Sequence, residues 1–209
     1  MWSTRTKVGW TVMTLGALVV ILFSLRYFTF NSEVYVESQR AVYEAHVVGL
    51  MLHITGMVFA LALGPFQFLR SLRNRHRSLH RTMGKVYIAC ALVGGLGGLY
   101  MSFYSIADIW SGVGFGLLAV GVLISTSQAY VSIRNRQIDE HREWMTRSFA
   151  LILAAVTLRI YAPVLQIWVS EYTTFAIVGF LSWVPNILVA EWMIRRQRGR
   201  TRELALAPA

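Results

Sequence analysis

The chain has 209 residues, of which 56% are hydrophobic and 14% are charged, and its mean hydropathy is +0.51. Soluble domains carry about 25% charged residues, so this composition argues against a soluble enzyme. The net charge of +10 would suit nucleic acid, but 17 of the 20 Lys and Arg residues fall in four blocks between apolar segments. That pattern orients a protein in a lipid bilayer, so we expect the bilayer as a partner and no nucleic acid.

Six apolar stretches follow one another, each long enough to cross a hydrocarbon core of ~30 Å as a helix. The predicted spans cover residues 8–30, 45–68, 86–106, 109–133, 148–169 and 172–194, and residues 195–209 form a basic tail. The first span resembles a signal peptide, but no small-residue cleavage site follows it, so we expect it to be retained. The glycine-rich residues 94–98 predict close packing of the third span against a neighbour.

The positions of the basic residues predict the orientation of the spans. The four basic blocks are Arg5 and Lys7; Arg70, Arg73, Arg75, Arg77, Arg81 and Lys85; Arg134, Arg136, Arg142 and Arg147; and Arg195, Arg196, Arg198, Arg200 and Arg202. The remaining loops contain one basic residue, Arg40. Because cytoplasmic loops carry an excess of Lys and Arg, both termini are expected in the cytoplasm. The predicted fold class is an all-α integral membrane protein, a single domain of six transmembrane helices.

Four polar residues are predicted to line a cavity in the outer half of the membrane. Arg159 lies about 18 Å along the fifth span from Arg147, where an unpaired charge costs roughly 2.5–3.5 kcal/mol. It should therefore face the bundle or a wet cavity. His53 reaches a similar depth in the second span, and His46 lies two turns before it on the same face. The predicted cavity contains His46, His53, Arg159 and Tyr161, and the alternative is an interhelical hydrogen-bond network without a ligand.

Two histidines open the third and fifth spans, each followed by arginine: His80 and His141. These spans run parallel, so the two imidazoles lie at the same depth and could hold the iron of one b-type haem from both sides. The basic residues suited to its propionates are Arg81, Lys85, Arg142 and Arg147. The alternative is a pair of interfacial His-Arg motifs that contact lipid phosphates.

Several motifs lie between residues 44 and 194. They are residues 64–68, 80–87, 141–148, 158–161 and 183–191. Together they resemble a bacterial family of predicted membrane proteins that is classed as a domain of unknown function. The resemblance implies an integral protein of the bacterial cytoplasmic membrane and supplies no activity.

The placement of the histidines also resembles the six-helix di-haem cytochromes b that move electrons from ascorbate. In those proteins spans two to five form a four-helix core, which the resemblance implies here. Spans three and five hold their inner haem, and His80 and His141 lie on these spans. The fourth span contains no histidine, so a second bis-histidine haem is not expected.

These observations support two predictions of function. The first is a membrane redox protein in electron transport, with one haem b at His80 and His141 or a quinone near His53 and Arg159. The second is a non-enzymatic transporter, receptor or assembly factor that binds a small anion or metal ion in the outer-half cavity. Two histidines seven residues apart are ~10.5 Å apart along a helix, so an anion or a quinone headgroup suits the cavity better than a metal ion.

Overall fold

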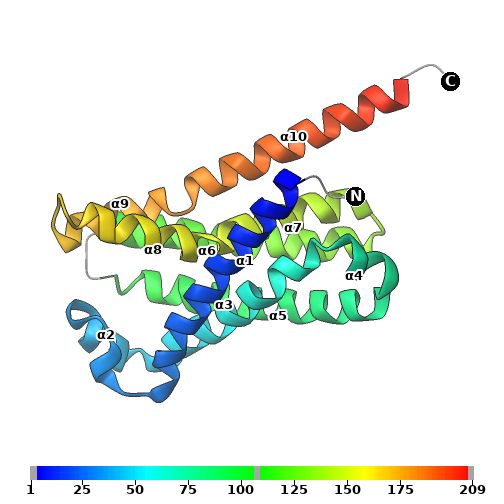
Figure 1. Ribbon diagram of the computed structural model, residues 1–209. Coiled ribbons are helices and arrows are strands. Elements are labelled where there is room, and N and C mark those ends of the chain that lie inside the picture. The colour runs from blue at the N-terminus through cyan, green and yellow to red at the C-terminus, as the bar shows by residue number, and fades with distance from the viewer. Residues whose placement is uncertain (1–3, 106–108, 207–209) are drawn as a thin grey trace.

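The computed structural model describes residues 4–105 and 109–206, and within these ranges the regular structure is entirely helical. Six segments are long and apolar enough to cross a membrane: Lys7–Thr29, Val47–Gln67, Arg77–Ser102, Ile109–Arg134, Ile138–Leu165 and Glu171–Arg200. The predicted fold class, an all-α protein with six transmembrane helices, is confirmed (Figure 1).

The first three spans are built from α1 (Thr4–Ser24) with η1 (Leu25–Thr29), from α3 (Val47–Gln67) and from α5 (Arg77–Ser102). The last three are α6 (Ile109–Arg134), α7 (Ile138–Ile152) with α8 (Ala154–Leu165), and α9 (Glu171–Leu181) with α10 (Val184–Leu206). The short connecting helices are η2 (Ser32–Val34), η3 (Glu37–Gln39), α2 (Arg40–Ala45) and α4 (Arg70–Arg75). The predicted end of the third span at Ile106 and residues 207–209 of the predicted tail lie outside the described residues.

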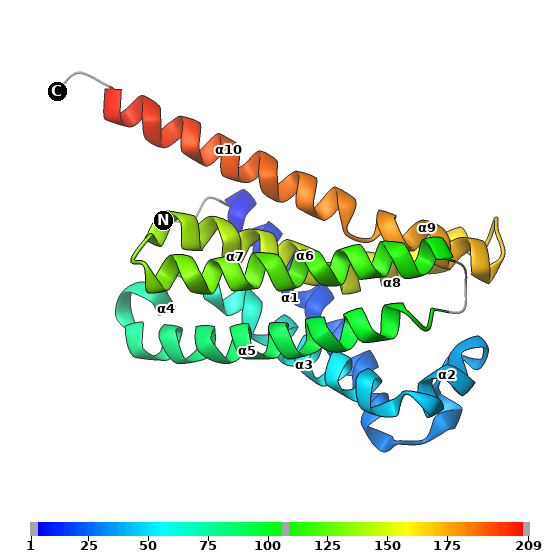
Figure 2. The same ribbon diagram turned by 180° about the vertical axis from the view of Figure 1, so that it is seen from behind.

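The two ends of the bundle differ in charge. Figure 1 shows which elements lie at each end. We call the end that carries α4 and the turn between α6 and α7 the basic end. The opposite end carries η2, η3, α2 and the turn between α8 and α9. Helices α5, α7 and α10 extend past the predicted spans at the basic end, because their Arg-rich flanks continue the helix instead of forming loops. The last turns of α10 project beyond the rest of the bundle (Figure 2).

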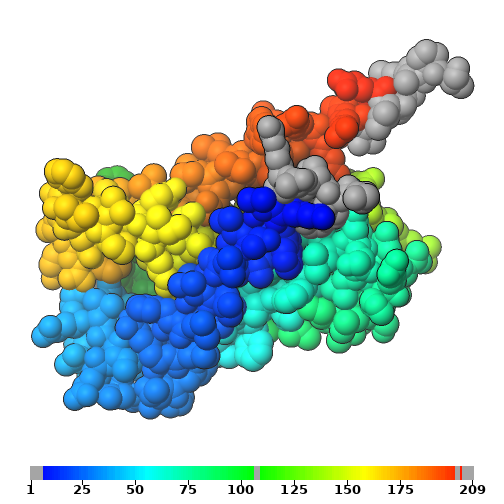
Figure 3. All heavy atoms as spheres, in the orientation of Figure 1, coloured from blue at the N-terminus to red at the C-terminus, as the bar shows by residue number. Residues whose placement is uncertain are grey.

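Spans two to five form a closed ring. Helix α3 packs on α5, α5 on α6, α6 on α7, and α7 returns to α3. Helix α1 lies diagonally across the outside of this ring, where it contacts α3 and α8 (Figure 3). Helix α9 covers α6, and α10 covers α7. The four-helix core implied by the cytochrome-like arrangement is therefore present, with the first and sixth spans on its outside.

The closest contact in the ring joins α3 and α5. A Cβ atom placed on Gly56 would lie 2.5 Å from the Cys90 carbonyl oxygen and 2.5 Å from the Gly94 nitrogen. A Cβ atom on Gly97 would lie 2.6 Å from the His53 nitrogen. Packing rather than the hydrophobic effect holds helices together in lipid, and small residues permit it. The predicted close packing at residues 94–98 is confirmed, with α3 as the neighbour.

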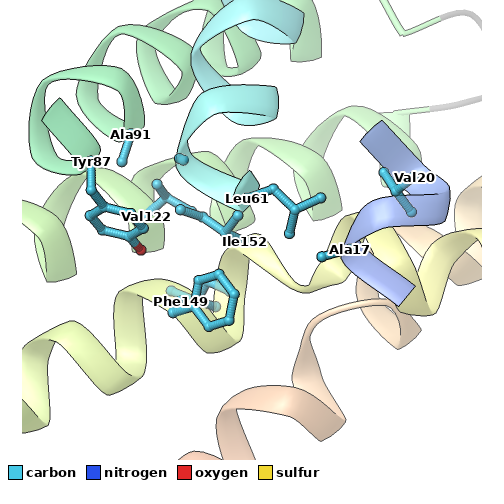
Figure 4. Close-up of a cluster of buried hydrophobic side chains, with 10 residues drawn as sticks. Ala17, Val20, Leu61, Tyr87, Ala91, Val122, Phe149 and Ile152 are labelled. Carbon is cyan, nitrogen blue, oxygen red and sulfur yellow. The ribbon is translucent and has the colours of Figure 1, made fainter. Parts of the chain in front are cut away.

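An apolar cluster fills the centre of the bundle, where five helices meet (Figure 4). Its buried members include Val20 of α1, Leu61 of α3, Tyr87 of α5, Val122 of α6 and Phe149 of α7. The one hydroxyl that enters this cluster, on Tyr87, lies 2.9 Å from the Ser148 hydroxyl, which lies 2.7 Å from that of Thr126. The hydroxyls thus satisfy one another and join α5, α6 and α7, which avoids the cost of unpaired polar groups in an apolar core.

The fifth and sixth spans are both broken near the middle. Helix α7 ends at Ile152 and α8 begins at Ala154, whereas α9 and α10 are separated by Ser182 and Trp183, just before Pro185. Proline lacks the N–H group that a continuous helix needs. The Ser182 carbonyl instead accepts hydrogen bonds from the side chains of Thr157 and Asn186, so the two breaks are joined. Arg159 lies on the half-helix that follows the break in the fifth span.

Candidate functional site

Arg159 is the centre of the candidate site. Its Nη1 donates to the Ala155 carbonyl at 3.0 Å, and its Nη2 donates to the Ser24 hydroxyl at 3.4 Å. Its Nε is buried and has no hydrogen-bond partner. No carboxylate within residues 4–105 and 109–206 forms an ion pair with it. Because a guanidinium has five N–H donors, this charge is only partly satisfied by the protein.

A second arginine lies close by. Arg26 of η1 has its Cζ 3.9 Å from the centroid of the Phe23 ring, and the Cζ of Arg159 lies 5.5 Å from the same ring. The Nε of Arg26 is also buried without a hydrogen-bond partner. Two cations beside one aromatic ring repel each other. Their attraction to the π-electrons of the ring offsets only part of this repulsion. The pair therefore creates a strongly positive region between α1 and α8.

Tyrosines border this region at the opposite end of the bundle. The Tyr27 ring stacks on Tyr35 at 5.8 Å between centroids, and Tyr35 meets Tyr43 edge to face at 5.6 Å. Burial raises the pKa of the Tyr43 phenol, as does neighbouring Tyr27, and the positive charge of Arg159 acts against that shift. The Tyr43 phenol is thus a neutral hydrogen-bond donor near the guanidinium. We call Phe23, Arg26, Tyr27, Tyr43 and Arg159 the Arg159 site.

The structure brings together only part of the predicted outer-half group. The charge of Arg159 acts on His53. The Nδ1 of His53 donates a hydrogen bond to the Gly94 carbonyl at 2.9 Å. His46 instead belongs to an aromatic cluster: its Nδ1 lies 2.8 Å from the Tyr100 hydroxyl, and its ring stacks on Tyr104 at 3.7 Å.

Tyr161 is predicted to line the same outer-half cavity as Arg159. The two residues are both on α8, two positions apart. Two positions turn a helix by about 200°, so the Tyr161 side chain leaves the opposite face of α8. Arg26, Tyr27 and Tyr43 were missed, because no sequence pattern showed that η1 and α2 fold over the end of the bundle.

The two predicted haem-ligand histidines both lie at the basic end, His80 on α5 and His141 on α7. The charge of His141 acts on His80, although less strongly than that of Arg73. The Nδ1–H of His141 donates to the Ala129 carbonyl at 2.8 Å, which leaves its Nε2 lone pair free, whereas the Nδ1 of His80 is buried without a partner. No group of three or more His, Cys, Asp or Glu residues in the described part of the chain could hold a metal ion. Two axial histidines are enough for a haem iron.

Two of the arginines predicted to bind propionates already have carboxylate partners. Arg147 donates to both oxygens of Glu191, at 2.5 and 3.2 Å, and lies 3.7 Å from Glu143. Arg142 pairs with Asp139 at 2.9 Å. The other two predicted partners, Arg81 and Lys85, are exposed at the basic end.

Six apolar helices around an interior that contains a charged, partly unpaired side chain define an integral membrane protein. The chain belongs to the family described as predicted membrane protein (DUF2306), whose model matches residues 50–194. This confirms the family resemblance seen in the sequence. No curated protein and no solved structure matches the chain.

Proposed function

We propose that this protein binds a small molecule with an anionic headgroup at the Arg159 site, as a transporter or receptor. The observation that supports this is the Arg159 guanidinium, which lies in a membrane-spanning helix with a buried, unpaired Nε and no acidic partner among the described residues. Ionisable residues inside membranes are costly and are generally tied to a ligand or an ion path. The nearby charge of Arg26 raises that cost further and makes an anion the best partner.

The geometry favours a carboxylate or similar planar anion. The guanidinium fork binds carboxylates with two parallel hydrogen bonds, and the tyrosine phenols of the site can donate further ones. A neutral quinone would use the same donors through one carbonyl oxygen and would gain less from the charge. The Arg159 site therefore supports the binding function more strongly than the quinone version of the redox function.

The direction of binding follows from the charge of the two ends. We place the basic end and both termini in the cytoplasm, since Lys and Arg concentrate on that side of a bacterial cytoplasmic membrane. The Arg159 site then lies toward the outer leaflet, because α2 lies at the opposite end from the basic one. Ligands would reach it from outside the cell.

Replacing Arg159 with glutamine tests this proposal. In the wild type, benzoate or succinate is expected to raise the melting temperature. A ligand present at 100 times its Kd stabilises the folded protein by about 2.7 kcal/mol. Arg159→Gln should lose this response and should also raise the melting temperature without ligand, because it removes an unpaired charge. Differential scanning fluorimetry in detergent measures both effects.

The matched control is Arg134→Gln, which removes one charge from the exposed end of α6 and should keep the ligand response. Decylubiquinone is tested in parallel, and a response to it alone would replace the anion with a quinone. If Arg159→Gln lowers stability and leaves every ligand response intact, Arg159 is a structural residue and the proposal is wrong.

A second candidate function is electron transfer by one b-type haem between His80 and His141. The observation that favours it is the His141 hydrogen bond to the Ala129 carbonyl, the type of contact that orients axial histidines. The Nε2 atoms of His80 and His141 would hold the iron, while Arg81 and Lys85 would bind the propionates. The haem would supply one-electron transfer.

An absorption spectrum tests the haem candidate. Protein expressed with ample haem is expected to show a Soret band that shifts on reduction with dithionite, and His141→Ala should abolish it. His76→Ala, which changes a histidine at the start of α5, is the control and should retain the band. A featureless spectrum for the wild type would eliminate this candidate and leave the Arg159 proposal untouched.

A further inference from the structure

The basic end contains a second group of buried polar atoms without partners. Gln67 is the last residue of α3 and is only 9% exposed, yet its Nε2 has no hydrogen-bond partner. The Nδ1 of His80 on α5 is likewise buried and unpaired. Buried polar groups are nearly always hydrogen-bonded, so two neighbouring exceptions indicate a missing partner.

The two groups converge on one face of α5. A Cβ atom placed on Gly84 would lie 3.5 Å from the Gln67 Oε1, so the Gln67 amide lies over α5 at Gly84. His80 is four residues earlier and therefore lies one turn away on the same face. Because Gly84 has no side chain, none at that position separates the Gln67 amide from the turn of α5 that carries His80.

The charges around this recess are positive. Arg73 of α4 is the charged group that acts most strongly on His80. Burial lowers the pKa of Arg73, and the nearby charges of Arg142 and Arg70 lower it further. Within the described residues, the only carboxylate paired with any of these arginines is Asp139, which bonds Arg142. The recess thus offers hydrogen-bond donors and excess positive charge.

We propose that the recess formed by Gln67, Arg73 and His80 binds the phosphate of an anionic phospholipid. Phosphate oxygens accept hydrogen bonds from amide, guanidinium and imidazole groups alike, and Arg suits phosphate geometry. In this proposal the Arg73 guanidinium supplies the positive charge, and the two unpaired groups of Gln67 and His80 supply the hydrogen bonds. Basic pockets between helices at the cytoplasmic face are a known mode of anionic lipid recognition.

The apolar surface beside the recess points to a lipid rather than to free phosphate. Phe66 is next to Gln67 and Leu79 is next to His80 in the sequence, and these two apolar residues are 41% and 51% exposed. Acyl chains would cover these side chains while the headgroup enters the recess. This inference is independent of the Arg159 proposal and uses the Nδ1 of His80, so the Nε2 remains free.

Titration of short-chain phosphatidylglycerol into the detergent-purified protein tests the inference. We expect saturable binding by native mass spectrometry, with phosphatidylcholine binding at least about tenfold more weakly. Gln67→Leu and Arg73→Gln should each weaken phosphatidylglycerol binding about tenfold, as expected for the loss of one charge-assisted hydrogen bond. Gln67→Leu conserves volume and charge, so it separates the lost donor from a lost charge.

Arg200→Gln is the matched control, since it removes a charge from the exposed part of α10 and should change affinity less than twofold. An equal loss in Arg200→Gln would show attraction by overall charge and overturn the inference. Full competition by inorganic phosphate would also overturn it, because free anion would then be the ligand. Arg159→Gln should leave phosphatidylglycerol binding unchanged whether or not the Arg159 site binds an anion.

Discussion

Gly56→Leu is expected to prevent the bundle from folding. A Cβ atom at this position would lie 2.5 Å from two backbone atoms of α5, the Cys90 carbonyl oxygen and the Gly94 nitrogen. Backbone cannot rotate aside as a side chain can, so α3 and α5 must separate and break the contact on which the ring depends. Overpacking alone costs typically about 1–3 kcal/mol, and loss of this interface should exceed that range. Size-exclusion chromatography and thermal unfolding in mild detergent measure the loss.

Gly9→Leu provides the matched control for this change. A Cβ atom on Gly9 would meet no heavy atom within 4 Å, although Gly9 also lies in a membrane-spanning helix. The same substitution should therefore leave the elution volume and melting temperature close to wild type. A folded, thermally normal Gly56→Leu protein would show that α3 and α5 can separate at little cost, contrary to the packing argument.

The contact between α3 and α5 also shows what a sequence can reveal about this fold. The glycines at residues 94–98 predicted close packing, because small residues in lipid permit little else. They did not identify the partner, since Gly56 and Gly49 lie among bulky residues and carry no signal of their own. Apolar length similarly predicted the six spans, whereas the helical continuation of the basic flanks depends on local propensity that hydropathy does not measure.

The polar residues were harder to group than the spans. His46 and His53 were placed on one face because they lie seven residues apart, which assumes a continuous helix. His46 has φ −120° and ψ 32°, so the helical geometry is interrupted there. Its ring consequently packs with Tyr100 and Tyr104, away from Arg159.

The cost of burying a charge gave the more reliable inference. It predicted that Arg159 faces the bundle or a wet cavity. This prediction does not depend on which elements supply the residues around Arg159. It could not identify Arg26, which reaches the site from the 3-10 helix that ends the first span, or Tyr43, which reaches it from the short helix α2 outside the spans. The same reasoning explains why Arg147 is unsuited to a propionate: Glu191, another costly charge in the same bundle, already neutralises it.

Arg147 and Glu191 are expected to be strongly coupled in stability. They join α7 to α10, and their side chains are 16% and 32% exposed, so each would leave the other poorly solvated if removed. Arg147→Ala and Glu191→Ala should each cost about 2 kcal/mol, below the 3–5 kcal/mol for a fully buried pair. The double variant should cost less than the sum of the two, by about 1–2 kcal/mol. Reversible unfolding of the four proteins in detergent gives this coupling.

The exposed pair of Arg142 and Asp139 supplies the comparison on the same helix. Its side chains are 47% and 91% exposed, and water replaces either partner at little cost, so its double-variant cycle should show no measurable coupling.

Arg198 also bonds Glu143, which lies 3.7 Å from Arg147. Loss of Arg147 should therefore loosen the projecting end of α10 as well, with faster proteolysis after Arg195 or Arg196. Equal coupling energies in both cycles would mean that burial adds no stability to the Arg147–Glu191 pair. Apolar packing alone would then hold α10 on α7.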